Sequence, residues 1–179
     1  MGCIKTFTGV MMDPLRPRME EIDIRDVAHA LSMLCRANGH FRTFYSVGQH
    51  SINCMREAAA RGEDRRVQLA CLLHDASEAY LSDVTRPVKA ELPRYLEIEE
   101  PLQALIWEKW LGGIRPEESK KVFQIDDDIL AHELDQLLNV RVDPFPALAG
   151  TPEMEFTGFV RCEEEFLACF RQLTEDPAS

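Results

Sequence analysis

Hydrophobic residues recur at helical spacing along most of the chain. The first apolar stripe consists of Ile24, Val27, Ala28, Leu31, Leu34 and Cys35, at steps of three and four residues. Asp23 precedes this stripe, where its side chain can cap the first helical turn, and Asn38-Gly39 follows it. The pattern predicts an amphipathic helix between these two signals.

The same spacing predicts five more helices. They are expected over residues 47–60, 64–80, from beyond Pro93 to Trp110, from Pro116 to about Leu137, and over 159–173. Residues 82–87 and 143–152 are expected to be loops, and residues 5–9 a short strand or an extended arm. No repeat, low-complexity tract or linker divides the chain. The simplest account is one all-α domain over residues 1–179, a bundle of about six helices.

Composition narrows the function classes. The 179 residues include 20 Lys and Arg against 31 Asp and Glu, a formal net charge of −11, and no localised basic stripe. Such a surface repels phosphate backbones, so polymeric nucleic acid is not an expected partner. No apolar stretch approaches the roughly 18 residues that a bilayer span requires. The six cysteines lack metal-ribbon spacing and are expected to be reduced core residues of a cytoplasmic protein.

His74 and Asp75 directly follow the apolar run 69–73, on the helix that should be the most buried. A carboxylate buried there costs several kcal/mol unless it is paired or binds a cation. For an isolated His-Asp pair, hydrogen bonds to backbone groups are the simpler interpretation. Two other polar positions, His50 and Asp126, favour a metal site instead.

His50 lies in the second predicted helix, and Asp126 opens a run of three acids inside the fifth. Asp126 falls beside the apolar stripe of its helix, whereas Asp127 and Asp128 rotate away by about 100° per residue. One of the three acids therefore points inward. The resulting donor set is His50, His74, Asp75 and Asp126. Two imidazoles and two carboxylates suit one divalent transition ion, such as Mn, Fe, Co, Ni or Zn.

Neighbouring polar residues can complete such a site. Glu78 lies one helical turn beyond His74 on the same face and could exchange protons with water or a leaving group. The candidates for substrate contacts are Arg36, His40, Asp83 and Lys89. On spacing alone each of these is more typical of a plain surface charge, and Glu78 could pair with a base such as Arg66 or Lys89.

Several stretches resemble the H…HD…D signature of the HD-domain metal-dependent phosphohydrolases. They are residues 45–50 (YSVGQH), 73–80 (LHDASEAY), 124–126 (QID) and 130–133 (LAHE). Residues 4–9, 35–40 and 44–47 look like the small HD enzymes that phages and prophages carry. The likeness covers most of the chain to about Asp135.

The resemblance implies that His50, His74, Asp75 and Asp126 are the metal ligands. The bacterial deoxynucleotide 5′-nucleotidases of this superfamily are similar to residues 74–89 at almost every position. Their counterpart of Glu78 is catalytic beside the ligand matching Asp75, that of Asp83 contacts the deoxyribose, and an arginine matching Arg36 contacts the phosphate. Ala37 stands where those enzymes have a tryptophan. A second His-Asp pair for another metal is absent from the sequence, which disfavours the cyclic-dinucleotide branch.

The expected function is therefore metal-dependent hydrolysis of a small deoxynucleotide, with a 5′-nucleotidase acting on deoxynucleoside monophosphates as the first choice. Release of triphosphate from a dNTP such as dATP, to adjust a phage nucleotide pool, is the alternative. A non-catalytic helical binding module is a third interpretation, and a cysteine hydrolase is disfavoured because no Cys lies beside a suitable base. A homo-oligomer is conceivable through Phe159, Phe166 and Phe170, although these residues also fit a core.

Overall fold

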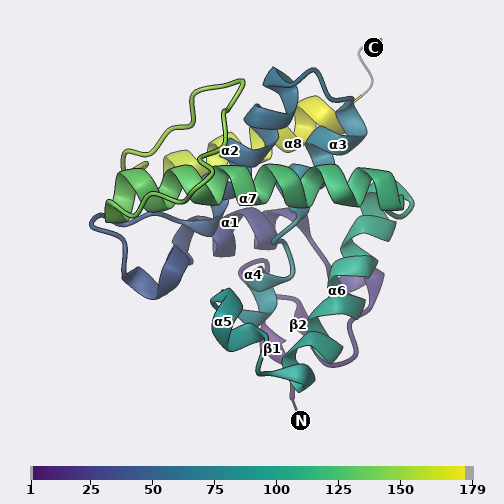
Figure 1. Ribbon diagram of the computed structural model, residues 1–179. Coiled ribbons are helices and arrows are strands. Elements are labelled where there is room, and N and C mark those ends of the chain that lie inside the picture. The colour runs from purple at the N-terminus through teal and green to yellow at the C-terminus, as the bar shows by residue number, and fades with distance from the viewer. Residues whose placement is uncertain (1, 176–179) are drawn as a thin grey trace.

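Six helices of nine residues or more make up most of the computed structural model, which describes residues 2–175 (Figure 1). They are α1 (Ile24–Met33), α2 (Val47–Ala60), α3 (Arg65–Leu73), α6 (Pro93–Leu111), α7 (Pro116–Leu138) and α8 (Phe159–Thr174). The shorter elements are η1 (Met19–Glu21), η2 (Arg36–Gly39), α4 (Glu78–Leu81), α5 (Arg86–Lys89) and the antiparallel pair β1 (Ile4–Lys5) and β2 (Met11–Met12). The all-α class and all six predicted helices are confirmed.

Polar side chains at the helix starts account for several of these boundaries. The Asp23 carboxylate accepts a hydrogen bond from the backbone N–H of Arg25, and the Ser46 hydroxyl accepts one from Gln49. Pro116 occupies the first turn of α7, where its missing N–H costs nothing. These caps confirm the sequence signals for α1, α2 and α7.

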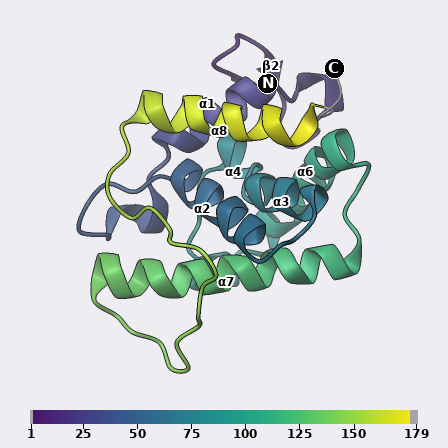
Figure 2. The same ribbon diagram turned by 90° about the horizontal axis from the view of Figure 1, so that it is seen from above.

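The helices form three layers, which Figure 2 shows from above. The antiparallel pair α2 and α3 lies in the middle, with α7 crossing one side and α1 with α8 packed on the other. Both middle helices are therefore covered on two faces. Core residues fill the spaces between the layers, among them Leu31, Leu72, Leu73, Ile125, Ile129 and Phe166. Polar side chains of α2, α3 and α7 that point into this interior need partners there.

Two predicted helices end earlier than expected. The first ends at Met33, because residues 34–35 turn into extended backbone: the N–H of Val47 binds the carbonyl of Leu34, and Cys35 forms a bridge with Ser46. The third ends at Leu73 instead of Tyr80, and α4 begins only after a turn. The expected loop after residue 82 also contains a helical turn, α5.

A glutamine from α6 stabilises the break after α3. The Gln103 amide donates to the carbonyl of Leu73 over 2.8 Å and accepts from the backbone N–H of Ser77 over 3.1 Å. These two bonds satisfy backbone groups that a continuous helix would have paired internally. After Leu73 the chain therefore passes from α-helical hydrogen bonding into tighter turns, in which the N–H of Ala76 binds the carbonyl of Leu73 and that of Glu78 binds the carbonyl of Asp75.

Residues 139–158 cross α2 as an extended segment without helix or strand. Gln49, Asn53 and Glu57, spaced one helical turn apart, bind its backbone. The Asn53 amide donates to the carbonyl of Glu153 over 2.8 Å and accepts from its N–H over 3.0 Å, while Glu57 accepts from Ala149 and Gly150. This segment connects α7 to α8 and covers one face of α2.

The cysteines and the last helix agree in part with the sequence. Cys54, Cys71 and Cys162 are buried thiols, Cys35 and Cys169 are half-buried, and Cys3 is exposed; none forms a disulfide. Phe166 and Phe170 belong to the core, whereas Phe159 is partly exposed. Among the helices of the described residues, none combines the length and the apolar character needed to cross a bilayer.

Candidate metal centre

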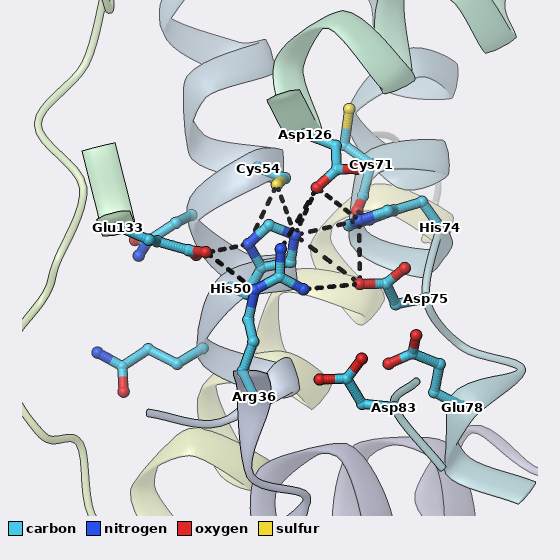
Figure 3. Close-up of polar contacts among 12 residues, drawn as sticks. Arg36, His50, Cys54, Cys71, His74, Asp75, Glu78, Asp83, Asp126 and Glu133 are labelled. Carbon is cyan, nitrogen blue, oxygen red and sulfur yellow. Dashed lines mark hydrogen bonds and ion pairs between the residues drawn. The ribbon is translucent and has the colours of Figure 1, made fainter. Parts of the chain in front are cut away.

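The four predicted donors meet at one point in the interior (Figure 3). His50 comes from α2, Asp126 from α7, and His74 and Asp75 from the turn after α3. The two imidazole Nε2 atoms lie 3.2 Å apart. Asp126 Oδ1 lies 3.0 Å from the Nε2 atom of His50 and 3.7 Å from that of His74. Asp75 Oδ2 lies 3.2 Å from His74 Nε2 and 3.8 Å from His50 Nε2.

These spacings match the donor set of a single ion. Nitrogen and oxygen ligands about 2.1 Å from one metal lie about 3.0 Å apart at a right angle and about 3.4 Å apart at the tetrahedral angle. The five measured donor separations run from 3.0 to 3.8 Å. One ion between the four atoms would therefore bring each donor to coordination distance with small side-chain adjustments.

Hydrogen bonds on the far side of each imidazole direct its lone pair toward this point. His50 Nδ1 lies 2.6 Å from Glu133 Oε1, and His74 Nδ1 lies 2.7 Å from the carbonyl of Cys71. Both neighbours are acceptors, so each Nδ1 carries a hydrogen, and in the neutral ring each Nε2 keeps a lone pair. Within the described residues, Asp126 Oδ1 is buried and accepts no hydrogen bond. Burial opposes protonation of the two rings, but the carboxylates of Glu133 and Asp126 beside His50, and of Asp75 and Asp126 beside His74, raise the pKa of both imidazoles. In the neutral rings, three lone-pair atoms face one another at this point, as metal donors do.

The break after α3 explains how adjacent residues can serve one ion. Consecutive side chains on an α-helix diverge by about 100°, which would direct His74 and Asp75 to different sides. Because the helix ends at Leu73, both side chains instead reach the same point. Burial opposes ionisation of Asp75, but the His74 imidazole and Arg36 hold the pKa of this carboxyl below its usual range.

Cys54 is buried beside these donors. The sequence predicts it only as a core residue. His50, Cys54, His74 and Asp126 offer donor atoms within 4.8 Å of one another, so this cluster can hold a metal ion. The Cys54 sulfur lies 3.5 Å from His50 Nε2 and 4.0 Å from Nδ1, beside the ring and away from the line of the Nε2 lone pair. Burial also raises the pKa of its thiol well above the usual value, which disfavours the ligating thiolate. Asp75 Oδ2, at 3.2 Å from His74 Nε2 and 3.8 Å from His50 Nε2, offers a further oxygen donor at the same point.

A cavity of about 460 Å³ opens beside the donors. Its charged lining consists of Arg36, Asp75, Glu78, Asp83, Arg86, Lys89 and Asp126, and its apolar lining includes Phe41, Leu130 and Leu134. The terminal nitrogens of Arg36 lie 3.4 Å from Asp75 Oδ2 and 3.5 Å from Asp126 Oδ1. Arg86 binds the second oxygen of Asp126. The cavity therefore joins the metal donors to three cationic side chains.

Glu78 is the buried acid of this cavity. Its side chain is 4% exposed, Lys89 Nζ lies 3.5 Å from one carboxyl oxygen, and the other oxygen has no hydrogen-bond partner within the described residues. Burial, together with the nearby carboxylates of Asp75 and Asp83, raises the pKa of Glu78 well above its usual value. This carboxyl consequently retains its proton where ordinary glutamates have lost theirs, as a general acid must.

The structure gathers every predicted site residue except His40. Asp83 lines the cavity, and its carboxylate accepts a hydrogen bond from the N–H of Ala37 over 3.1 Å. His40 follows η2, is exposed and does not line the cavity, because the left-handed backbone at Ala37 and Asn38 turns the chain outward before it. A substrate contact by His40 therefore finds no support in the geometry.

Comparison with curated proteins identifies relatives that span nearly the whole chain. The uncharacterized protein YfdR of Escherichia coli (strain K12) is 36% identical over 155 residues, which cover 87% of this chain and 83% of YfdR. The chain belongs to the same family as YfdR. An uncharacterized protein of Rhodobacter capsulatus is 32% identical over 157 residues, covering 83% of this chain and 80% of that protein. No family model matches the chain.

Three residues that lie beside the donors were not among the site residues predicted from the sequence: Cys54, Glu133 and Arg86. Cys54 follows His50 by one turn of α2, and Glu133 follows Asp126 by two turns of α7, so helical spacing alone could have indicated both. Arg86 lies in a segment expected to be a loop, and its contacts with Asp126 and Asp127 cross 40 residues of sequence or more. No local pattern signals that contact.

Proposed function

We propose that this chain is a metal-dependent phosphohydrolase of small deoxynucleotides, and that it removes the 5′-phosphate of deoxynucleoside monophosphates. The observation that carries the proposal is the set of four donor atoms turned toward one point at separations of 3.0 to 3.8 Å, beside a cavity with three cations. The likeness of His50, His74-Asp75 and Asp126 to the HD signature supports the same class. A divalent ion held by these donors would supply Lewis-acid chemistry, polarising a phosphoryl oxygen and making water a better nucleophile.

Three residues of the chain would bind the phosphate, protonate the leaving oxygen and bind the sugar. Arg36 presents its terminal nitrogens next to Asp75 and Asp126, where they can bind the non-bridging oxygens of a phosphate. Water attacks phosphorus, the bond from phosphorus to the 5′-oxygen breaks, and protonated Glu78 gives its proton to the leaving oxygen. A proton released by the attacking water then restores Glu78. Orthophosphate and a deoxynucleoside result. Asp83 would accept a hydrogen bond from the sugar.

The charge balance of the cavity favours a monophosphate over a triphosphate. Four carboxyl groups and three cations line it, so the lining carries one net negative charge at most and none when Glu78 is protonated. A divalent ion would then balance a phosphate monoester, which carries about two negative charges. A triphosphate would bring further charge, and the described residues offer the cavity no additional lysine or arginine.

The apolar wall of the cavity would seat the base. Phe41, Leu130 and Leu134 lie along it, and the ring of Phe41 is fixed by a perpendicular contact with Tyr45 at 6.0 Å between centroids. Base–aromatic contacts stabilise binding by about 1–3 kcal/mol and tolerate different bases. We therefore expect modest base selectivity. Phe41 would supply the aromatic surface that Ala37 cannot.

The test is a panel of dNMPs, dNTPs, ribonucleotides and 2-deoxyribose 5-phosphate, each supplied with Mn²⁺ or Co²⁺ and repeated after chelation. We expect orthophosphate from dNMPs, loss of activity with chelator, and a tenfold or larger fall of kcat/KM for dNMPs in Phe41→Ala with little change for 2-deoxyribose 5-phosphate. Tripolyphosphate from a dNTP would replace the monophosphate assignment with nucleotide-pool editing. Absence of turnover with every metal would overturn the proposal in favour of a binding module.

A further inference from the structure

A carboxylate lies behind the metal donors, fully enclosed by protein. The side chain of Glu133 is 0% exposed. Its Oε1 lies 2.6 Å from His50 Nδ1, and its Oε2 lies 2.9 Å from Arg36 Nε (Figure 3). One carboxylate therefore contacts both a metal donor and the arginine that reaches into the cavity.

Each of these two contacts of Glu133 orients the atoms of its partner that face the donors and the cavity. A hydrogen on His50 Nδ1 excludes one on Nε2 in the neutral ring, so the bond to Glu133 keeps the lone pair of Nε2 directed at the metal centre. The bond to Arg36 Nε leaves both terminal nitrogens of the guanidinium free to face Asp75, Asp126 and the cavity. Glu133 thus sets the orientation of two groups whose functional atoms lie on its far side.

The backbone at Arg36 is anchored, because its N–H binds the carbonyl of Tyr45 over 2.9 Å, but this bond does not fix the guanidinium. Arg36 begins the four-residue η2, in which Ala37 (φ 54°) and Asn38 (φ 51°) adopt the left-handed conformation. This conformation costs a non-glycine residue about 1 kcal/mol or more. Outside its own backbone, the Arg36 side chain is held by acids: Glu133, Asp75 and Asp126. Asp75 and Asp126 are the metal donors themselves, so Glu133 is the anchor that stays available in every state of the site.

We propose that Glu133 is a positioning residue that couples the two binding functions of the site: it holds His50 for the metal and Arg36 for the phosphate. The inference rests on the proposed function of the site. Its distinctive consequence is a double effect, because one substitution at Glu133 should weaken two affinities that involve different ligands. Substitution of Arg36 should weaken phosphate binding without weakening metal binding, because it removes a positive charge beside the ion.

The test uses Glu133→Gln and two ligands, Co²⁺ and inorganic phosphate. Glutamine has a single oxygen acceptor, so its amide hydrogens face either His50 Nδ1 or Arg36 Nε. We expect the Co²⁺ affinity, measured by competition with a chelating dye, to fall about 10–100-fold. With Co²⁺ saturating, phosphate affinity followed by the visible Co²⁺ spectrum should fall about tenfold, the least that losing a hydrogen bond between charged groups costs.

Matched variants separate positioning from general damage. Glu118→Gln removes another buried carboxylate of α7 that pairs with two arginines, Arg66 and Arg115, far from the donors, and should leave both affinities unchanged. Arg36→Gln should lower the phosphate affinity without lowering the Co²⁺ affinity, because it removes a positive charge beside the ion. Nitrogen NMR of histidine should show the Nδ1–H form of His50 in the wild type and a mixture of tautomers in Glu133→Gln.

Each outcome decides one question. Wild-type affinities for both ligands in Glu133→Gln would overturn the coupling while leaving the proposed function intact. Failure of the wild type to bind Co²⁺ would overturn the metal centre itself, and the proposed function with it. Should Glu133→Gln not fold, Glu133→Asp decides: it keeps both oxygens on a side chain one methylene shorter, so both affinities should fall, and wild-type values would overturn the proposal.

Discussion

Two adjacent acids of α7 differ only in the direction in which they point. The side chain of Asp126 is 11% exposed and faces the two imidazoles, whereas that of Asp127 is 55% exposed and faces outward. Both bind Arg86. Substitution by asparagine therefore removes one charge and one contact with Arg86 in either case, and removes a metal donor in only one.

We predict that Asp126→Asn loses bound metal and phosphohydrolase activity, and that Asp127→Asn retains both. The loss should reach at least 10³-fold in kcat/KM, because the donor is a ligand of the proposed reactive ion. Metal analysis after desalting, together with the turnover assay, measures the two effects. Equal metal content in both variants would contradict the assignment of Asp126.

Glu78 should lower the free energy of unfolding once the pH rises above the acidic range. Its pKa is raised in the folded protein, chiefly by burial, so the folded state holds a proton that the unfolded chain releases near pH 4–5. Between the unfolded and the folded pKa the native state binds more protons, and stability falls as pH rises.

We predict that Glu78→Gln is more stable than the wild type at pH 7–8 and equally stable near pH 4. Bound metal should be unchanged, and dNMP turnover should fall about 10²–10⁴-fold, as expected for loss of a general acid. Urea unfolding at several pH values measures the first effect. A stability difference that is the same at every pH would contradict the raised pKa.

At the residue scale, the sequence predicted those site residues that helical spacing places at or beside a buried face. His50 and Asp126 were found because each interrupts or borders an apolar stripe, and such a polar residue must have a partner. Glu133 was missed as a site residue because one acid among many polar positions on α7 is unremarkable until its 0% exposure is known. His40 was included because it is close to Arg36 in sequence, but the left-handed turn at residues 37–38 separates them in space.

At the scale of elements, α2 uses two faces for different purposes. One face carries His50 and Cys54 toward the metal centre, and the other binds residues 149–157 through Gln49, Asn53 and Glu57. The Asn53 amide also donates to the hydroxyl of Tyr45 over 2.8 Å. Asn53 is 1% exposed, so these bonds have no water to replace them.

We predict that Asn53→Ala lowers the free energy of unfolding by about 2–4 kcal/mol, because it leaves buried polar groups without partners. Limited proteolysis should cut within residues 139–158 first. Ser51→Ala is the matched control on the same helix: its hydroxyl is buried and has no hydrogen-bond partner within the described residues, so its removal should cost little. Similar losses in the two variants would contradict the role given to Asn53.

The break after α3 shows where element prediction had to fail. Residues 64–80 contain neither proline nor glycine, so their local pattern favours one continuous helix. The groups that stabilise the break belong to Gln103, some 30 residues further along the chain. A tertiary contact of this kind leaves no mark in the local sequence. The six long helices were predictable because each buries its own stripe.

At the scale of the whole molecule, net charge complicates any test of metal binding. With a formal net charge of −11, the protein attracts cations of every kind to its surface, and such ions weaken the repulsion between acids. Stabilisation by a metal salt is therefore informative only when ions of different chemistry are compared. Two imidazole donors favour transition ions, whereas Mg²⁺ and Ca²⁺ prefer sites built from oxygen alone.

We predict that Co²⁺ or Zn²⁺ at about 100 times its Kd stabilises the protein by about 2.7 kcal/mol. For a domain of this size that corresponds to a rise in Tm of about 5–10 °C. Equal concentrations of Ca²⁺ should produce a much smaller rise, and a chelator should reverse the effect of Co²⁺. Thermal unfolding followed by circular dichroism measures all three. If Ca²⁺ stabilised the protein as strongly as Co²⁺, the effect would belong to the acidic surface, and the interior site of two histidines and two aspartates would lose its support.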